Sequence, residues 1–147
     1  MTEVPPVLPV AVQERVRWSD CDPLGIIYYG TYIRFFEVAE NEMFRLAGLP
    51  YHVLRVERQV QLPRKAFQVE FHSPAEMDEL VEIRVGVSRL GETSLTMRFE
   101  AYRASDLRHR ASASLTVVSV EKESITKRPL PQFVKDALKP YLVPPGA

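Results

Sequence analysis

The chain has 147 residues, of which 46% are hydrophobic and 26% are charged. This length fits one domain of ordinary size. The sequence contains no run of about 18 apolar residues, which is the length needed to cross a bilayer as a helix. The 19 basic and 19 acidic residues cancel, so we expect no general attraction to nucleic acid or to a membrane. The single cysteine excludes an internal disulfide framework, and the first residues lack a secretory signal, so we expect a cytoplasmic protein.

Prolines mark both ends of the chain. Residues 1–9 contain three of the 12 prolines and are predicted to form a flexible arm, and residues 142–147 are predicted to form a C-terminal tail. Between them we expect a single domain over residues 10–141, because no repeat, low-complexity tract or linker divides this part of the chain.

The first predicted element is a strand over Val10–Trp18, and the second is a long helix over Thr31–Ala47. In the helix, apolar residues recur at intervals of three and four, with charged residues on the other face. Gly48 and Pro50 provide a stop signal, because glycine accepts the left-handed cap conformation and proline cannot continue the hydrogen-bond ladder.

After the helix, apolar and polar residues alternate with the period of two that is typical of strands. Gly91 lies between two such runs and predicts a hairpin, and the next run is expected to pair with the second strand of that hairpin. The predicted strands cover residues 54–62, 67–71, 81–87, 94–101 and 110–117, and a short helix covers Gln132–Leu138.

This order of elements predicts an α+β protein. A curved antiparallel sheet of about five to six strands would wrap around the apolar face of the one long helix. Because a lone sheet with a single helix leaves a face or an edge poorly covered, we also expect self-association.

The junction between the first strand and the helix is the most unusual segment, with the sequence WSDCDPLGIIYYGTY over residues 18–32. Asp20 and Asp22 could simply cap turns in a tight loop. A calcium loop is excluded, because Leu24 stands where an oxygen ligand is required and Thr31 stands where a bidentate glutamate is required. A carboxylate just before a helix N-terminus could instead assist hydrolysis of an activated acyl group, since the free amides there stabilise developing negative charge.

The sequence DCDPLGIIYYGTYIRFFE over residues 20–37 resembles the signature of the 4-hydroxybenzoyl-CoA thioesterase family. The resemblance continues in HSPAEMDEL (residues 72–80), in ASA (residues 111–113) and in RPLP (residues 128–131), and it covers about residues 10–141. It implies a hotdog fold, with active sites at the interface of a homodimer that assembles further into a homotetramer.

The same resemblance implies roles for individual residues. The second carboxylate of the motif is the family's catalytic group and corresponds to Asp22, which would act as nucleophile or general base, while Asp20 would be structural. The polarising donor would be the backbone amide at about Tyr29, with Gly30 beside it. An aromatic residue at position 29, where many relatives that act on short aliphatic acyl groups have histidine, favours an aromatic or bulky acyl group.

Other reactive residues have weaker claims. The aspartates that flank Cys21 should raise its thiol pKa and disfavour a cysteine nucleophile. The histidines His52, His72 and His109 have no metal-ligand spacing, and we expect surface or capping roles for them and no metal. The basic residues Arg64–Lys65 and 108–110 could contact coenzyme A phosphates or could be solvated strand ends.

The predicted function is hydrolysis of an acyl-CoA thioester to a free acid and coenzyme A, with no cofactor. The acyl group would be aromatic, such as 4-hydroxybenzoyl, or a medium or short aliphatic chain. Two alternatives remain: a thioesterase acting on acyl carrier protein, and an acyl-CoA-binding protein of the same fold without catalysis.

Overall fold

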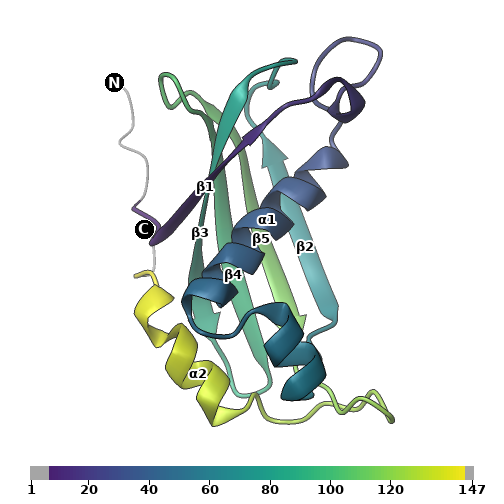
Figure 1. The fold of residues 1–147 in the computed structure, drawn as a ribbon, viewed down its shortest axis with the longest axis vertical. Coiled ribbons are helices and arrows are strands. Elements are labelled where there is room, and N and C mark those ends of the chain that lie inside the picture. The colour runs from purple at the N-terminus through teal and green to yellow at the C-terminus, as the bar shows by residue number, and fades with distance from the viewer. Residues whose placement is uncertain (1–6, 145–147) are drawn as a thin grey trace.

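The computed structural model describes residues 7–144 and has five strands and two α-helices (Figure 1). The strands are β1 (Val10–Arg15), β2 (Arg64–Phe71), β3 (Leu80–Leu90), β4 (Ser94–Arg103) and β5 (His109–Val118). The α-helices are α1 (Thr31–Leu46) and α2 (Gln132–Leu138), and short helical turns cover η1 (Trp18–Asp20), η2 (His52–Glu57) and η3 (Lys139–Tyr141).

All five strands form one antiparallel sheet in the order β1-β3-β4-β5-β2. The sheet curves around α1, which crosses its concave face (Figure 1). At the contact, the Phe36 ring lies 5.1 Å from the Phe99 ring between centroids, and both side chains are buried. The α+β layout and the hairpin at Gly91 are confirmed, as is the pairing of the last two strands.

The predicted strand at residues 54–62 is wrong. The first part of this segment is the helical turn His52–Glu57, and Gln59 follows with a positive φ of 57°. In a strand, Leu54 and Val56 would lie on the same face and would both be buried. Here Leu54 is fully buried, but Val56 is 59% exposed. Short apolar runs do not distinguish strand from helix by periodicity alone.

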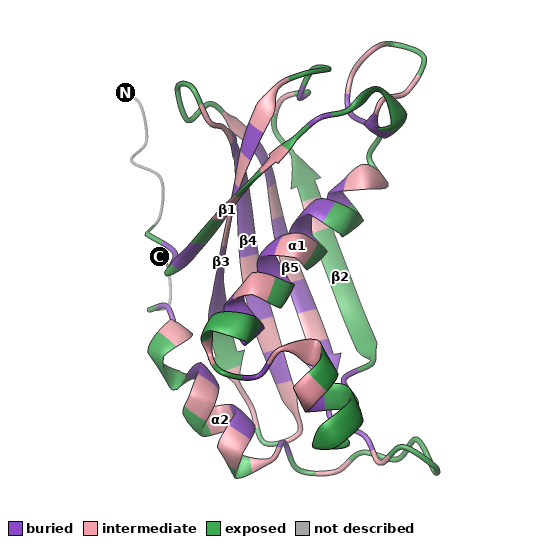
Figure 2. Cartoon of the chain, viewed as in Figure 1, coloured by how far each residue is buried: buried purple, intermediate pink, exposed green. Residues whose placement is uncertain are grey.

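Strand β2 lies at one edge of the sheet, and within residues 7–144 its only strand partner is β5. Figure 2 shows it as exposed along nearly its whole length, in contrast to the buried strands β3, β4 and β5. Phe67 and Phe71 are 39% and 55% exposed on this strand. An exposed edge with apolar side chains is a template for pairing with another strand.

The two ends of the described chain meet on β3. A Cβ atom added to Gly86 would lie 2.8 Å from Pro9 and 2.8 Å from Val143, and the Val143 amide donates to the Val87 carbonyl at 2.9 Å. The predicted arm and tail extend into residues 1–6 and 145–147, which lie outside the described residues, so the boundaries at 10 and 141 stay predictions.

Between residues 7 and 144, no helix combines the length and the apolar character needed to cross a membrane.

Candidate active site

Asp20 holds the strand-to-helix junction together. It is 6% exposed, and its carboxylate accepts hydrogen bonds from the Arg17 amide and from the Arg34 guanidinium, both at 2.8 Å. Its carbonyl oxygen accepts bonds from the Tyr28 amide at 2.7 Å and from the Thr31 hydroxyl at 3.0 Å. Every acceptor of Asp20 is therefore engaged in fixing the loop to the start of α1.

Asp22 starts a tight turn in the same loop. Its carbonyl accepts a hydrogen bond from the Gly25 amide at 3.0 Å, and Gly25 has a φ of +78°, which favours glycine. The Asp22 Oδ1 atom accepts a bond from the Leu24 amide at 2.8 Å. Within residues 7–144 the other carboxylate oxygen has no hydrogen-bond donor, so one face of the carboxylate is free to contact a ligand.

The first turn of α1 leaves two backbone amides without acceptors. The carbonyls of Tyr28, Tyr29 and Gly30 accept the amides of the first helical residues at 2.9 to 3.3 Å. Among the described residues, nothing accepts the N–H groups of Tyr29 and Gly30 themselves. Free amides at a helix N-terminus carry partial positive charge and can stabilise an oxyanion.

An aromatic ring lies close to Gly30. A Cβ atom at this position would lie 2.6 Å from the Tyr28 ring. The Tyr28 and Tyr29 rings lie 4.6 Å apart between centroids, and the Tyr29 side chain is 66% exposed. The side chain of Tyr29 thus stands at the surface, while its backbone faces the start of the helix.

A cavity of about 420 Å³ brings Asp22 and Tyr29 together with residues far away in the chain. One wall comes from the junction and α1, and the other comes from the end of β2 and the residues that follow it. The lining residues are Asp22, Ile26, Ile27, Tyr29, Tyr32, Phe71, His72, Ser73 and Pro74.

The second wall was not assigned any role from the sequence, although HSP at residues 72–74 belongs to the family resemblance. His72 and His109, expected to be separate surface residues, stack with ring centroids 4.1 Å apart. The Nε2 atom of His109 lies 2.6 Å from buried Glu100, and Ser112 bonds both His72 at 2.9 Å and Glu100 at 2.6 Å. The pairing of β4 with β5 places Glu100 opposite Ser112, and the pairing of β2 with β5 brings His72 beside them.

The alternative reactive residues gain no support. Partial burial, followed by the charges of Asp20 and Asp22, raises the pKa of the Cys21 thiol, so the reactive thiolate is disfavoured. Arg110 is 3% exposed and pairs with Glu79, so it is neither a solvated strand end nor free for phosphate. Among residues 7–144, no group of three acidic, histidine or cysteine side chains could hold a metal ion.

Comparison with known proteins decides the family. The model of the thioesterase-like superfamily matches residues 16–138. The chain belongs to this superfamily. The match includes the junction, α1, the four strands β2 to β5 and α2, so both walls of the cavity lie within the shared domain.

Individual members support the assignment. The chain is 30% identical over 120 residues to the acyl-CoA thioester hydrolase YbgC of Escherichia coli, covering 82% of this chain and 88% of the relative. It is 28% identical to the 4-hydroxybenzoyl-CoA thioesterase of Pseudomonas sp. strain CBS-3, covering 65% of this chain and 70% of the relative.

The fold agrees with solved thioesterases. The crystal structure of a 1,4-dihydroxy-2-naphthoyl-CoA thioesterase from Synechocystis matches with a TM-score of 0.81 at 18% identity, covering 88% of this chain and 94% of the other. The expected hotdog fold, a sheet wrapped around one long helix, is confirmed.

Proposed function

We propose that this protein hydrolyses acyl-CoA thioesters, with Asp22 as the catalytic carboxylate. The observation that carries the proposal is that one carboxylate oxygen of Asp22 has no hydrogen-bond donor among the described residues, and that Asp22 lines the cavity beside the start of α1. At that point the backbone amides of Tyr29 and Gly30 have no acceptor among the described residues. The names of the relatives in the superfamily agree with this activity.

The residues supply the two functions that thioester hydrolysis needs. The thioester carbonyl oxygen would accept a bond from the Tyr29 or Gly30 amide, so that charge on this oxygen is stabilised as the tetrahedral intermediate forms. Asp22 would take a proton from the attacking water, or would attack the carbonyl carbon itself to give an anhydride that water then opens. The carbon–sulfur bond breaks, and the thiolate leaving group takes up a proton to give coenzyme A.

The walls of the cavity favour an aromatic or bulky acyl group. Tyr29, Tyr32 and Phe71 contribute three aromatic rings, and the Tyr32 and Phe71 rings lie 5.8 Å apart between centroids. Aromatic rings attract a further ring in offset-stacked or edge-to-face geometry. Two of the similar proteins are named for aromatic acyl-CoA substrates.

We further propose that the protein is cytoplasmic and forms a homodimer that assembles into a tetramer. Its activity would need no cofactor. The free edge of β2 supports self-association, because its two exposed phenylalanines lie on the strand that ends at the cavity. The second subunit would then complete the wall of each active site.

The test is thiol release from a panel of acyl-CoA thioesters, including benzoyl, 4-hydroxybenzoyl, acetyl and long-chain acyl groups. Wild type is compared with Asp22→Asn and with Asp136→Asn, an exposed carboxylate on α2 that serves as the matched control. We expect kcat/KM to fall by about a hundredfold or more only in Asp22→Asn.

Equal activity of wild type and Asp22→Asn would remove Asp22 from the mechanism. Absence of turnover on the whole panel would overturn the acyl-CoA activity, and the same variants would then be measured with acyl carrier protein thioesters.

A further inference from the structure

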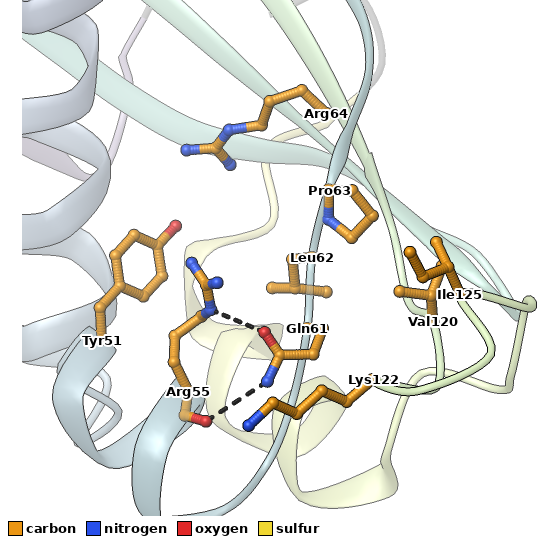
Figure 3. Close-up of a pocket in the computed structure, with 9 residues that line it drawn as sticks. All are labelled: Tyr51, Arg55, Gln61, Leu62, Pro63, Arg64, Val120, Lys122 and Ile125. Carbon is orange, nitrogen blue, oxygen red and sulfur yellow. Dashed lines mark hydrogen bonds between the residues drawn. The ribbon is translucent and has the colours of Figure 1, made fainter.

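A second cavity, of about 350 Å³, lies at the other end of β2 from the candidate active site (Figure 3). It is enclosed by the turn η2, the residues that lead into β2, and the loop that follows β5. We call it the Arg55 pocket. Its lining residues are Tyr51, Arg55, Gln61, Leu62, Pro63, Arg64, Val120, Lys122 and Ile125.

The Arg55 pocket carries an excess of positive charge. Three of its nine lining residues, Arg55, Arg64 and Lys122, are cations, and none is an acid. Among the described residues, no carboxylate lies within 4.0 Å of Arg55 or Lys122. A pocket that keeps unpaired cations together is electrostatically suited to an anion, since field lines are focused inside a concave surface.

Arg55 is held in place by a neutral side chain. Its Nε atom donates to Gln61 Oε1 at 3.1 Å, and Gln61 Nε2 donates back to the Arg55 carbonyl at 3.4 Å (Figure 3). These contacts orient the guanidinium, and within residues 7–144 its two terminal nitrogens have no hydrogen-bond partner. A guanidinium in this state can bind two oxygens of one phosphate or carboxylate.

Arg64 is shared between the pocket and a buried acid. Its guanidinium lies 2.9 Å from Glu40, which is 1% exposed on α1. The ion pair uses part of the guanidinium, while the side chain remains 43% exposed. Arg64 can therefore contribute charge to the pocket without leaving Glu40.

The remaining walls are apolar. Leu62, Pro63, Val120 and Ile125 form one side, and the Tyr51 ring stands across from them (Figure 3). A cavity of this size with one apolar side and several cations matches a planar base joined to charged groups better than it matches a small inorganic ion. The structure assigns the Arg55 pocket as a binding site for an organophosphate of about nucleotide size.

Two sources could supply such a ligand. One is the phosphorylated nucleotide end of coenzyme A, and this link rests on the function proposed above. The strand β2 has eight residues and so spans about 26 Å, which separates the two cavities of one chain. Antiparallel pairing of two β2 edges would bring the Arg55 pocket of one chain near the Asp22 cavity of its partner. The other source is a free nucleotide.

Binding is tested first, without any turnover. Isothermal titration with 3′-phospho-ADP is carried out on wild type, Arg55→Gln and Lys122→Gln, with Lys139→Gln, an exposed lysine beyond α2, as the matched control. We expect saturable binding by wild type and the control, weakened about tenfold or more in each pocket variant. Thermal unfolding confirms that the variants are folded. No binding by wild type, or equal binding by all four proteins, would overturn the assignment.

Kinetics then separate the two sources. For one acyl group, KM is measured with the coenzyme A thioester and with the pantetheine thioester, which lacks the nucleotide. If the pocket holds coenzyme A, Arg55→Gln raises KM for the first substrate only and leaves kcat nearly unchanged. If titration shows binding but both KM values stay at the wild-type level, the link to coenzyme A is overturned and the pocket serves a free nucleotide. Because the titration needs no activity, failure of the proposed function would leave this assignment testable.

Discussion

Two aspartates one residue apart have opposite environments. Asp20 is buried and uses both carboxylate oxygens on protein partners, whereas Asp22 uses one oxygen on a turn amide and keeps the other free. The turn-capping role that the sequence allowed for Asp22 is therefore real. It is compatible with the catalytic role proposed above, because capping needs only one of the two oxygens.

Replacing Asp20 by alanine should mainly lower stability. The variant loses two hydrogen bonds to a buried carboxylate, one of them to Arg34, whose side chain is 44% exposed. We expect a decrease of about 2 kcal/mol in the free energy of unfolding, measured by urea denaturation. Asp22→Ala should lose less than about 1 kcal/mol, since it gives up a single bond at a half-buried position. If Asp22→Ala lowered the free energy of unfolding more than Asp20→Ala does, the structural role of Asp20 would be contradicted.

Glu40 should make stability depend on pH. Burial raises its pKa to about 7 from 4.5, and the attraction of Arg64 opposes this only in part. Because the folded state binds the proton more tightly than the unfolded state, this contribution is fully present below pH 4.5 and is lost as pH rises through about 7. We expect Glu40→Gln to reduce the decrease of the free energy of unfolding between pH 4.5 and about pH 7, measured by urea denaturation at a series of pH values. An unchanged decrease would show that Glu40 is not its source.

Among the elements, α1 could be predicted almost to the residue, from Thr31 to Leu46 rather than Ala47. Its apolar period and its stop signal are both local in the sequence. The segment at residues 54–62 could not be predicted, because its apolar spacing fits a strand. Only contacts with distant parts of the chain, such as the hydrogen bond from Arg128 to the Gln59 carbonyl, select the observed conformation.

The two cavities also differ in how far the sequence alone could predict them. The part of the candidate active site that contains Asp22, Tyr29 and Gly30 lies within nine consecutive residues and could be recognised in the sequence. The half built by residues 71–74, and the whole Arg55 pocket, depend on segments brought together by the sheet. No spacing rule reaches across such distances.

The turn that carries Asp22 should be sensitive to substitution of Gly25. This residue has a φ of +78°, and no atom lies within 4 Å of a Cβ added there, so only backbone strain opposes a side chain. We expect Gly25→Ala to lower the free energy of unfolding by about 1 kcal/mol and to lower kcat by displacing Asp22. Gly25→Asn should lose less, since asparagine tolerates this conformation. Equal losses in urea denaturation would argue against a backbone origin.

At the scale of the whole molecule, self-association through β2 can be tested on Phe67. Its ring packs 6.1 Å from Phe36 between centroids, yet 39% of the side chain is exposed at the free edge. Light scattering coupled to gel filtration should give wild type a mass of at least twice the 16.8 kDa of one chain. Phe67→Asp should shift it towards 16.8 kDa, because a buried charge would oppose strand pairing.

The control for this experiment is Leu107→Asp, which changes a residue that is 37% exposed on the turn between β4 and β5. Its mass should equal that of wild type. A monomeric wild type, or a Phe67→Asp variant of unchanged mass, would exclude β2 as the interface.

The meeting of the chain ends on β3 has a practical consequence. Pro9 and Val143 both approach Gly86, and β4 and β5 separate β3 from the free edge of β2. A short peptide could therefore join Pro9 to Val143, and new ends could be opened in the exposed turn at residues 104–108 without touching either cavity. The fold is thus open to circular permutation, and attachment to a solid support through this new connection would leave the β2 edge and the candidate active site facing solution.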